Sequence, residues 1–215
     1  MTASLARFLT YALLCLLVSR QPSPALAAES EARQRLESTI NAVLAELGRP
    51  ERNDPAKQQE IMDSVEKIIL TLFDFGELSM RAVGPAWLTF SEDHKNRFQA
   101  AFTNLLRERY LEKLAGYDGE TVTYLDESAS KDGRRAEIQT SVDVKGTPVS
   151  VAYCMTRKDN WVVYDVVIER VSMVHYYRDQ FQELLSKGDV EQLIRQVGDM
   201  AAKMRDLNRP RQAAQ

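Results

Sequence analysis

The sequence predicts an α+β fold in which several helices flank one antiparallel sheet meander. Apolar residues recur at the helical spacing of about 3.6 residues before residue 121 and after residue 169, but between these positions they alternate with polar residues. Short turns join the alternating runs, which is typical of antiparallel hairpins. Helical segments on both sides of a block of hairpins favour the α+β class over a doubly wound sheet.

Residues 1–27 are typical of a secretory signal segment. Arg7 precedes the apolar run Phe8–Val18, and Ala25-Leu26-Ala27 provides small residues at the cleavage site. The apolar run is too short for a membrane span, which takes about 20 apolar residues. We therefore expect cleavage before Ala28, a single α+β domain over residues 28–207 and a disordered polar tail over residues 208–215.

Five stretches carry apolar residues at helical spacing. Gly48 is expected to end the first, and Ser91 to cap the third ahead of two acidic residues. Gly84-Pro85 breaks a short helical stretch before Trp87, and Gly188-Asp189 opens the last helix. The apolar stripes of the five helices lie within Leu36–Leu47, Ile61–Leu72, Phe98–Tyr110, Tyr177–Leu185 and Val190–Met204.

The alternating region contains three clear strands. The first covers Ala136–Val144, and the turn Lys145-Gly146-Thr147 separates it from the second, Val149–Met155. A turn at Asp159-Asn160 precedes the third strand, Trp161–Ile168, whose apolar residues occupy both faces. This last strand is therefore expected to be buried on both sides.

Asp165 is a lone carboxylate within the strand Trp161–Ile168. A buried carboxylate is unfavourable unless it is paired, so we predict a structural ion pair with Arg178. The alternative is that Asp165 acts as the base of a small pocket enzyme, with Tyr164 or Tyr153 as the electrophile. Neighbouring strand residues point to opposite faces, however, so Asp165 and Tyr164 cannot share one pocket.

The composition excludes several other classes of function. The formal net charge of −3 becomes more acidic once a signal segment with two arginines is removed, which argues against nucleic acid as a partner. Neither a Walker-type phosphate loop nor a G-x-S-x-G elbow occurs. His94 and His175 are far apart without neighbouring cysteine ligands, and Cys154 alone follows the signal segment. The sequence therefore predicts no metal site, no cofactor and no internal disulfide.

Three motifs, taken in order along the chain, resemble the MlaC-type phospholipid-binding proteins, also called the toluene-tolerance family. They are FDFGELSMRAVGPAW (Phe73–Trp87), LLRERYLEKLAGY (Leu105–Tyr117) and WVVYDVVIERVSMVHYYRDQF (Trp161–Phe181). The resemblance covers roughly Asp54–Gly198. The chain departs from the family at Arg170, where members commonly carry glycine.

The resemblance implies a soluble, periplasmic, non-enzymatic phospholipid carrier that maintains outer-membrane lipid asymmetry. Its expected partners are phospholipid, an inner-membrane ABC transporter complex and an outer-membrane lipoprotein-porin complex, and no stable membrane insertion is expected. Family members are thought to hold lipid tails between helices and sheet, so the fold should enclose an apolar cavity. The expected lining is Phe98, Phe102, Leu106, Tyr110, Val149, Val151, Tyr153, Val163 and Val167.

Three other functions stay open from the residues alone. An apolar cavity discriminates poorly between hydrocarbon shapes, so a carrier of a hopanoid or sterol-like lipid is one alternative. The pocket enzyme built on Asp165 is the second. The third is a scaffold in which the same apolar faces simply pack against each other.

Overall fold

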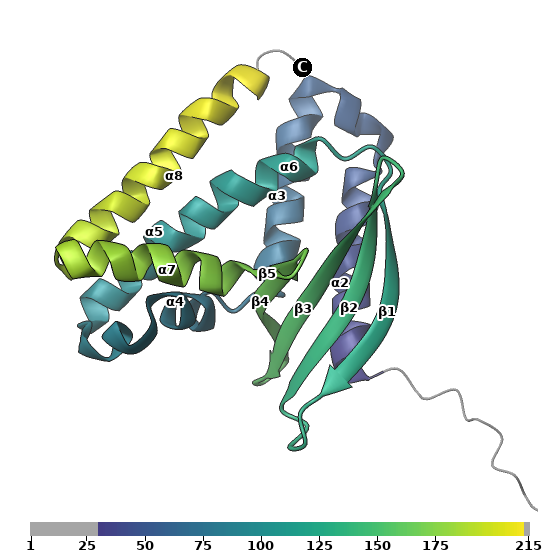
Figure 1. Cartoon of the computed structure of the whole chain (residues 1–215). Coiled ribbons are helices and arrows are strands. Elements are labelled where there is room, and N and C mark those ends of the chain that lie inside the picture. The colour runs from purple at the N-terminus through teal and green to yellow at the C-terminus, as the bar shows by residue number, and fades with distance from the viewer. Residues whose placement is uncertain (1–29, 213–215) are drawn as a thin grey trace, which may run out of the picture. The chain divides into compact units, whose positions relative to one another are not determined.

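A five-stranded antiparallel sheet and two groups of helices make up the structure, a computed structural model that describes residues 30–212 (Figure 1). Residues 31–212 belong to one compact unit. The predicted signal segment, residues 1–27, lies outside the described residues. Within residues 30–212, no helix is long and apolar enough to cross a membrane.

The sheet is the predicted meander. Its strands follow one another in space as they do in sequence, and each is antiparallel to the next. The α+β prediction is therefore confirmed. The strands are β1 (Thr121–Ala129), β2 (Arg135–Val144), β3 (Thr147–Arg157), β4 (Trp161–Ile168) and β5 (Val171–Ser172).

The helices also follow the predicted stripes. Ser91 caps the third predicted helix, since its hydroxyl accepts a hydrogen bond from the backbone N–H of His94 at 3.1 Å. The α-helices are α2 (Glu31–Leu47), α3 (Pro55–Leu70), α4 (Phe75–Val83), α5 (Glu92–Leu106), α6 (Glu112–Ala115), α7 (Met173–Lys187) and α8 (Val190–Gln212). Short helical turns η1 (Pro50–Asn53) and η2 (Gly84–Thr89) connect them, and a π-helical turn η3 (Arg107–Leu111) joins α5 to α6.

The end of α8 differs from the sequence prediction. We expected a disordered tail from Asn208, whereas α8 continues to Gln212. Asn208 is buried, and its side-chain amide donates a hydrogen bond to the backbone oxygen of Glu108 at 2.8 Å. This contact with η3 extends the packing of α8 along α5, which local composition does not reveal.

Buried apolar residues form two separate cores. In the first, α4, α5, α7 and α8 pack around the rings of Phe98, Phe102, Tyr177 and Phe181. In the second, α2 covers one face of the sheet, which we call the inner face. The second core contains Leu36, Ile138, Met155 and Val163, each less than 1% exposed. Phe73 and Met173 pack against both cores, so the two cores adjoin.

A β-bulge in β4 changes which residues face inward. Cys154 of β3 pairs with Asp165, but the next β3 residue, Met155, pairs with Val163, so β4 carries one extra residue here. Before the bulge, Val163 belongs to the inner face. After it, Val166 and Ile168 face inward instead of the odd-numbered positions.

The turn between β4 and β5 holds two non-glycine residues in the left-handed region, Glu169 (φ 48°) and Arg170 (φ 67°). This conformation costs an ordinary residue roughly 1–2 kcal/mol. Glycine tolerates it but loses more entropy on folding, by roughly 0.5–1 kcal/mol.

We therefore expect Arg170→Gly to raise the free energy of unfolding by about 0.5–1 kcal/mol, as measured by urea denaturation. Lys131→Gly provides the control, because Lys131 lies in the turn after β1 without a positive φ and should gain nothing. Equal effects of the two substitutions would show that the turn at Arg170 is unstrained.

Candidate functional site

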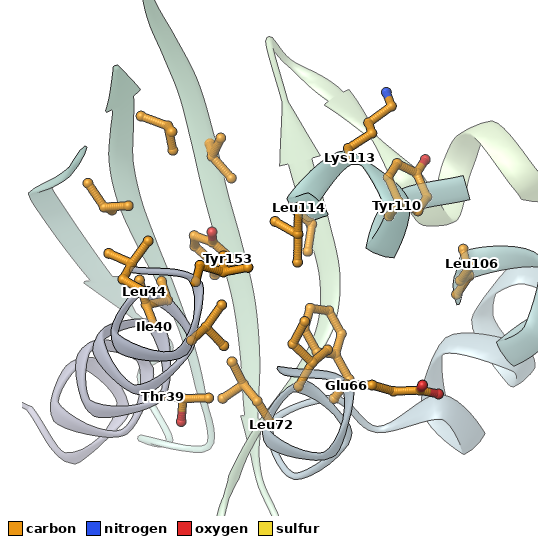
Figure 2. Close-up of a pocket in the computed structure, with 18 of the residues that line it drawn as sticks. Thr39, Ile40, Leu44, Glu66, Leu72, Leu106, Tyr110, Lys113, Leu114 and Tyr153 are labelled. Atoms are coloured by element: carbon orange, nitrogen blue, oxygen red, sulfur yellow. The ribbon is translucent and has the colours of Figure 1, made fainter. Parts of the chain in front are cut away.

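A cavity of about 540 Å³ lies between the inner face of the sheet and the helices α2, α3 and α5–η3–α6 (Figure 2). Its size falls within the range of about 300–1,000 Å³ that is usual for small-molecule sites. Its sheet wall consists of Val122, Val142, Val144, Val151, Tyr153, Val166 and Ile168. Its helical walls include Ile40, Val43, Leu44, Leu47, Ile69, Leu106, Tyr110 and Leu114, and Leu72 lines it from the turn after α3.

The cavity exists because α5 changes its packing partner along its length. The N-terminal half of its apolar stripe packs on the other helices, where Phe98 lies 5.3 Å from Phe181 and Phe102 lies 4.9 Å from Tyr177 between ring centroids. Only the C-terminal end of the stripe, with Leu106 and its continuation in η3 and α6, turns toward the sheet. None of the side chains that the structure describes fills the space between this end and the sheet.

Three charged side chains of the described lining, those of Glu66, Arg107 and Lys113, lie at the edge of the cavity. Arg107 Nε and Glu66 Oε1 are 3.0 Å apart and join η3 to α3, and the Arg107 side chain is 43% exposed. In Figure 2 the ammonium group of Lys113 and the carboxylate of Glu66 both point away from the central space. An uncharged interior of this kind suits hydrocarbon and is unfavourable for an ion.

Tyr153 is the polar side chain of the sheet wall. It is partly exposed, and its exposed part faces the cavity because the residue belongs to the lining. Burial raises the pKa of its phenol to about 12. The hydroxyl therefore remains protonated at neutral pH and is available as a donor.

The structure places the nine predicted lining residues in different surroundings. Leu106, Tyr110, Val151 and Tyr153 line the cavity, as expected. The other five belong elsewhere. Phe98 and Phe102 lie in the helical core, Val163 lies in the sheet core, Val149 packs beside that core, and Val167 pairs with Ala152 on the opposite face.

Three of these five misplacements, those of Val167, Phe98 and Phe102, have two physical causes, whereas Val163 and Val149 face inward but pack in or against the sheet core. The bulge in β4 reverses the side-chain alternation between Val163 and Val167, so strict alternation assigns Val167 to the wrong face. The two phenylalanines share a stripe with Leu106, but α7 and α8 cover that part of α5. Periodicity reports that a face avoids water and does not identify what covers it.

The sequence analysis missed the contribution of α2 and α3. Their stripes include Ile40, Leu44 and Ile69, which are only half-buried although they lie on the apolar sides of their helices. The stripes themselves were predicted, but nothing in the sequence placed these two helices around the same cavity as α5. The amphipathic pattern of α2 and α3 was the available signal, but it does not show which element their apolar sides face.

The predicted ion pair between Asp165 and Arg178 is wrong. Asp165 is buried and accepts hydrogen bonds from the hydroxyl of Ser172 at 2.6 Å and from the backbone N–H of Val174 at 3.0 Å. Arg178 instead donates to the backbone oxygen of Arg81 through Nε at 2.9 Å and Nη2 at 2.6 Å. The carboxylate is thus satisfied by the N-terminus of α7, where the helix dipole also favours a negative charge.

Asp165 does not line the cavity. The pocket-enzyme alternative required this carboxylate as a base facing the bound molecule, so it loses its central residue. Among the residues that the structure describes, no group of three or more His, Cys, Asp or Glu side chains could hold a metal ion.

The fold and the cavity together define a class of protein in which a helix-covered antiparallel sheet holds an apolar ligand. The family model described as "MlaC protein" matches residues 37–199. The chain therefore belongs to the MlaC family.

Two relatives illustrate the family. The chain is 23% identical over 204 residues to the intermembrane phospholipid transport system binding protein MlaC of Haemophilus influenzae, covering 91% of this chain and 92% of the relative. It also resembles the solved structure of a phospholipid-binding protein from Ralstonia solanacearum in complex with a phospholipid. That match has a TM-score of 0.73 and 25% identity, and covers 81% of this chain and 99% of the other.

Proposed function

We propose that this protein is a periplasmic phospholipid carrier that holds the lipid tails in the cavity and performs no bond chemistry. It carries glycerophospholipid between an outer-membrane lipoprotein-porin complex and an inner-membrane ABC transporter complex, and so maintains outer-membrane lipid asymmetry. The observation that carries the proposal is the cavity of about 540 Å³, whose walls are apolar and whose charged side chains Glu66, Arg107 and Lys113 lie at the edge. Membership of the MlaC family and the phospholipid in the Ralstonia relative support it.

The energetics of lipid transfer explain why a carrier needs such a cavity. Two acyl chains contain on the order of 30 methylenes, and each contributes roughly 0.8 kcal/mol when it leaves water. A shallow groove would leave much of this surface exposed. Tails that enter between the sheet and α2, α3 and α5 can be covered, while a charged head group stays at the edge beside Arg107 and Lys113.

The head group is expected outside the cavity for a second reason. A phosphate taken into an apolar space requires cations to compensate its lost hydration. Of the two cations in the lining, Arg107 is engaged with Glu66, and Lys113 points away from the interior. The arrangement therefore fits a lipid that is bound chiefly through its tails.

Native mass spectrometry of protein purified from periplasmic extract tests the proposal. We expect a mature chain that begins at Ala28 and carries a bound diacyl phospholipid. A bound polycyclic lipid would assign the cavity to the hopanoid or sterol-like class instead. Protein that carries no lipid, and takes up none from phospholipid vesicles, would contradict the carrier function.

A further inference from the structure

The hydroxyl of Tyr153 has no hydrogen-bond partner among the side chains and backbone that the structure describes. Tyr153 lies on β3 between Ile138 of β2 and Val166 of β4, and it forms part of the cavity wall (Figure 2). No hydrogen bond joins its hydroxyl to any of residues 30–212. Thr39 of the same lining differs, because its hydroxyl donates to the backbone oxygen of Arg35 at 2.9 Å.

A tyrosine at this position is unfavourable once hydrocarbon fills the cavity. Buried polar groups are almost always hydrogen-bonded, and tails packed against this hydroxyl would remove it from water without giving it a partner. Phenylalanine would fill nearly the same space without this disadvantage. An unpartnered donor that faces a cavity therefore indicates that the bound molecule supplies the acceptor.

The chemistry of that acceptor follows from the surroundings of Tyr153. Burial alone raises the pKa of the phenol, with no contribution from a charged neighbour. Its paired neighbours Ile138 and Val166 are apolar and buried. A charged phosphate or carboxylate would have no cation to compensate it here, so an uncharged oxygen fits best.

We propose that the Tyr153 hydroxyl donates a hydrogen bond to an uncharged oxygen of the bound lipid, and thereby makes the carrier selective for lipids with an oxygen at this level of the cavity. The inference rests on the proposed function. Two sources can supply such an oxygen. One is the ester carbonyl that joins an acyl chain to glycerol, and the other is a hydroxyl carried on the chain itself.

Tyr153→Phe tests the proposal because it removes the hydroxyl alone. The matched control is Tyr124→Phe. The Tyr124 hydroxyl is buried without a partner and its ring packs against the same sheet core, but Tyr124 does not line the cavity. The mature wild-type protein and both variants would compete for three phospholipids with one head group and one chain length. These are a diacyl ester, a dialkyl ether and a diacyl ester with a mid-chain hydroxyl.

We expect the wild type and Tyr124→Phe to favour the diacyl ester over the dialkyl ether by about 2- to 12-fold, the effect of one hydrogen bond, and Tyr153→Phe to lose this preference. The wild type could instead prefer the lipid with the mid-chain hydroxyl, and Tyr153→Phe could lose that preference. This result would identify the hydroxyl on the acyl chain as the acceptor. The melting temperature of lipid-free Tyr153→Phe should equal or exceed that of the wild type.

Three results would overturn the inference. Identical selectivity of the wild type and Tyr153→Phe would mean that water satisfies the hydroxyl. Equal loss of selectivity in Tyr124→Phe would trace the effect to the sheet core, and a lower melting temperature of lipid-free Tyr153→Phe would trace it to packing. A wild type that binds none of the three lipids would contradict the proposed function itself, which distinguishes the two failures.

Discussion

Replacing Val151 with tryptophan is expected to expel lipid from the cavity while leaving the lipid-free protein nearly as stable as the wild type. Val151 lies on the inner face of β3 and forms part of the cavity wall. The added ring can enter space that no protein side chain occupies, so it competes with the lipid tails rather than with the core. Lipid content by native mass spectrometry and unfolding of the lipid-free protein in urea measure the two effects.

Val163→Trp is the matched control for this experiment. Val163 is also an inner-face valine, on the neighbouring strand β4, but it is fully buried in the sheet core and does not line the cavity. Overpacking at such a site typically costs about 1–3 kcal/mol. We expect Val163→Trp to lose stability by this amount. A similar loss of stability in both variants, with lipid retained by Val151→Trp, would show that the cavity is a solid core and would contradict the carrier function.

The second large effect concerns the way in which α7 is anchored. Asp165→Ala removes the acceptor for Ser172 and for the backbone of Val174, and leaving such buried donors unpaired costs about 1–3 kcal/mol. Arg178→Ala removes the donors to the backbone oxygen of Arg81, which tie α7 to α4. Because the two side chains share no partner, the losses should add to within about 0.5 kcal/mol in the double variant.

Urea denaturation of the four proteins in this cycle supplies the measurement. A coupling energy between Asp165 and Arg178 well above about 0.5 kcal/mol would show that the two side chains interact, as the sequence analysis predicted. Asp165→Asn is a useful intermediate variant, since its amide oxygen can still accept one hydrogen bond, and its loss should be smaller. Folded Asp165→Ala should retain its lipid, because Asp165 does not line the cavity. A stable Asp165→Ala protein without lipid would instead place this carboxylate in the binding site.

The sequence predicted the elements well because each depends on local physical rules. Spacing of about 3.6 residues identified the apolar stripes of five helices, alternation identified β2 and β3, and an apolar run after a turn identified β4. The short turn Lys145-Gly146 set the hairpin between β2 and β3. The sequence also showed that Asp165 needs a partner, since that requirement follows from burial alone.

The choice of partner for Asp165 could not be predicted. A carboxylate in an apolar strand can be satisfied by a cation or by backbone N–H groups at a helix start. A sequence reveals cationic side chains such as Arg178. It does not reveal which helix will begin beside the carboxylate, because every helix has free N–H groups at its N-terminus. Here β5 is only two residues long, so α7 begins close to β4 and presents the N–H of Val174 to the carboxylate.

The composition of the cavity wall likewise depended on the tertiary structure. Four of the nine expected residues line it. The bulge in β4 accounts for Val167, the cover that α7 and α8 provide accounts for Phe98 and Phe102, and the sheet core takes up Val163 and Val149. The sequence by itself determined which side chains avoid water, because the spacing of apolar residues along each helix or strand shows which side of it is apolar. Only the tertiary structure decided whether such a side chain meets protein or an open space, because this depends on the distance between elements that are far apart in the chain.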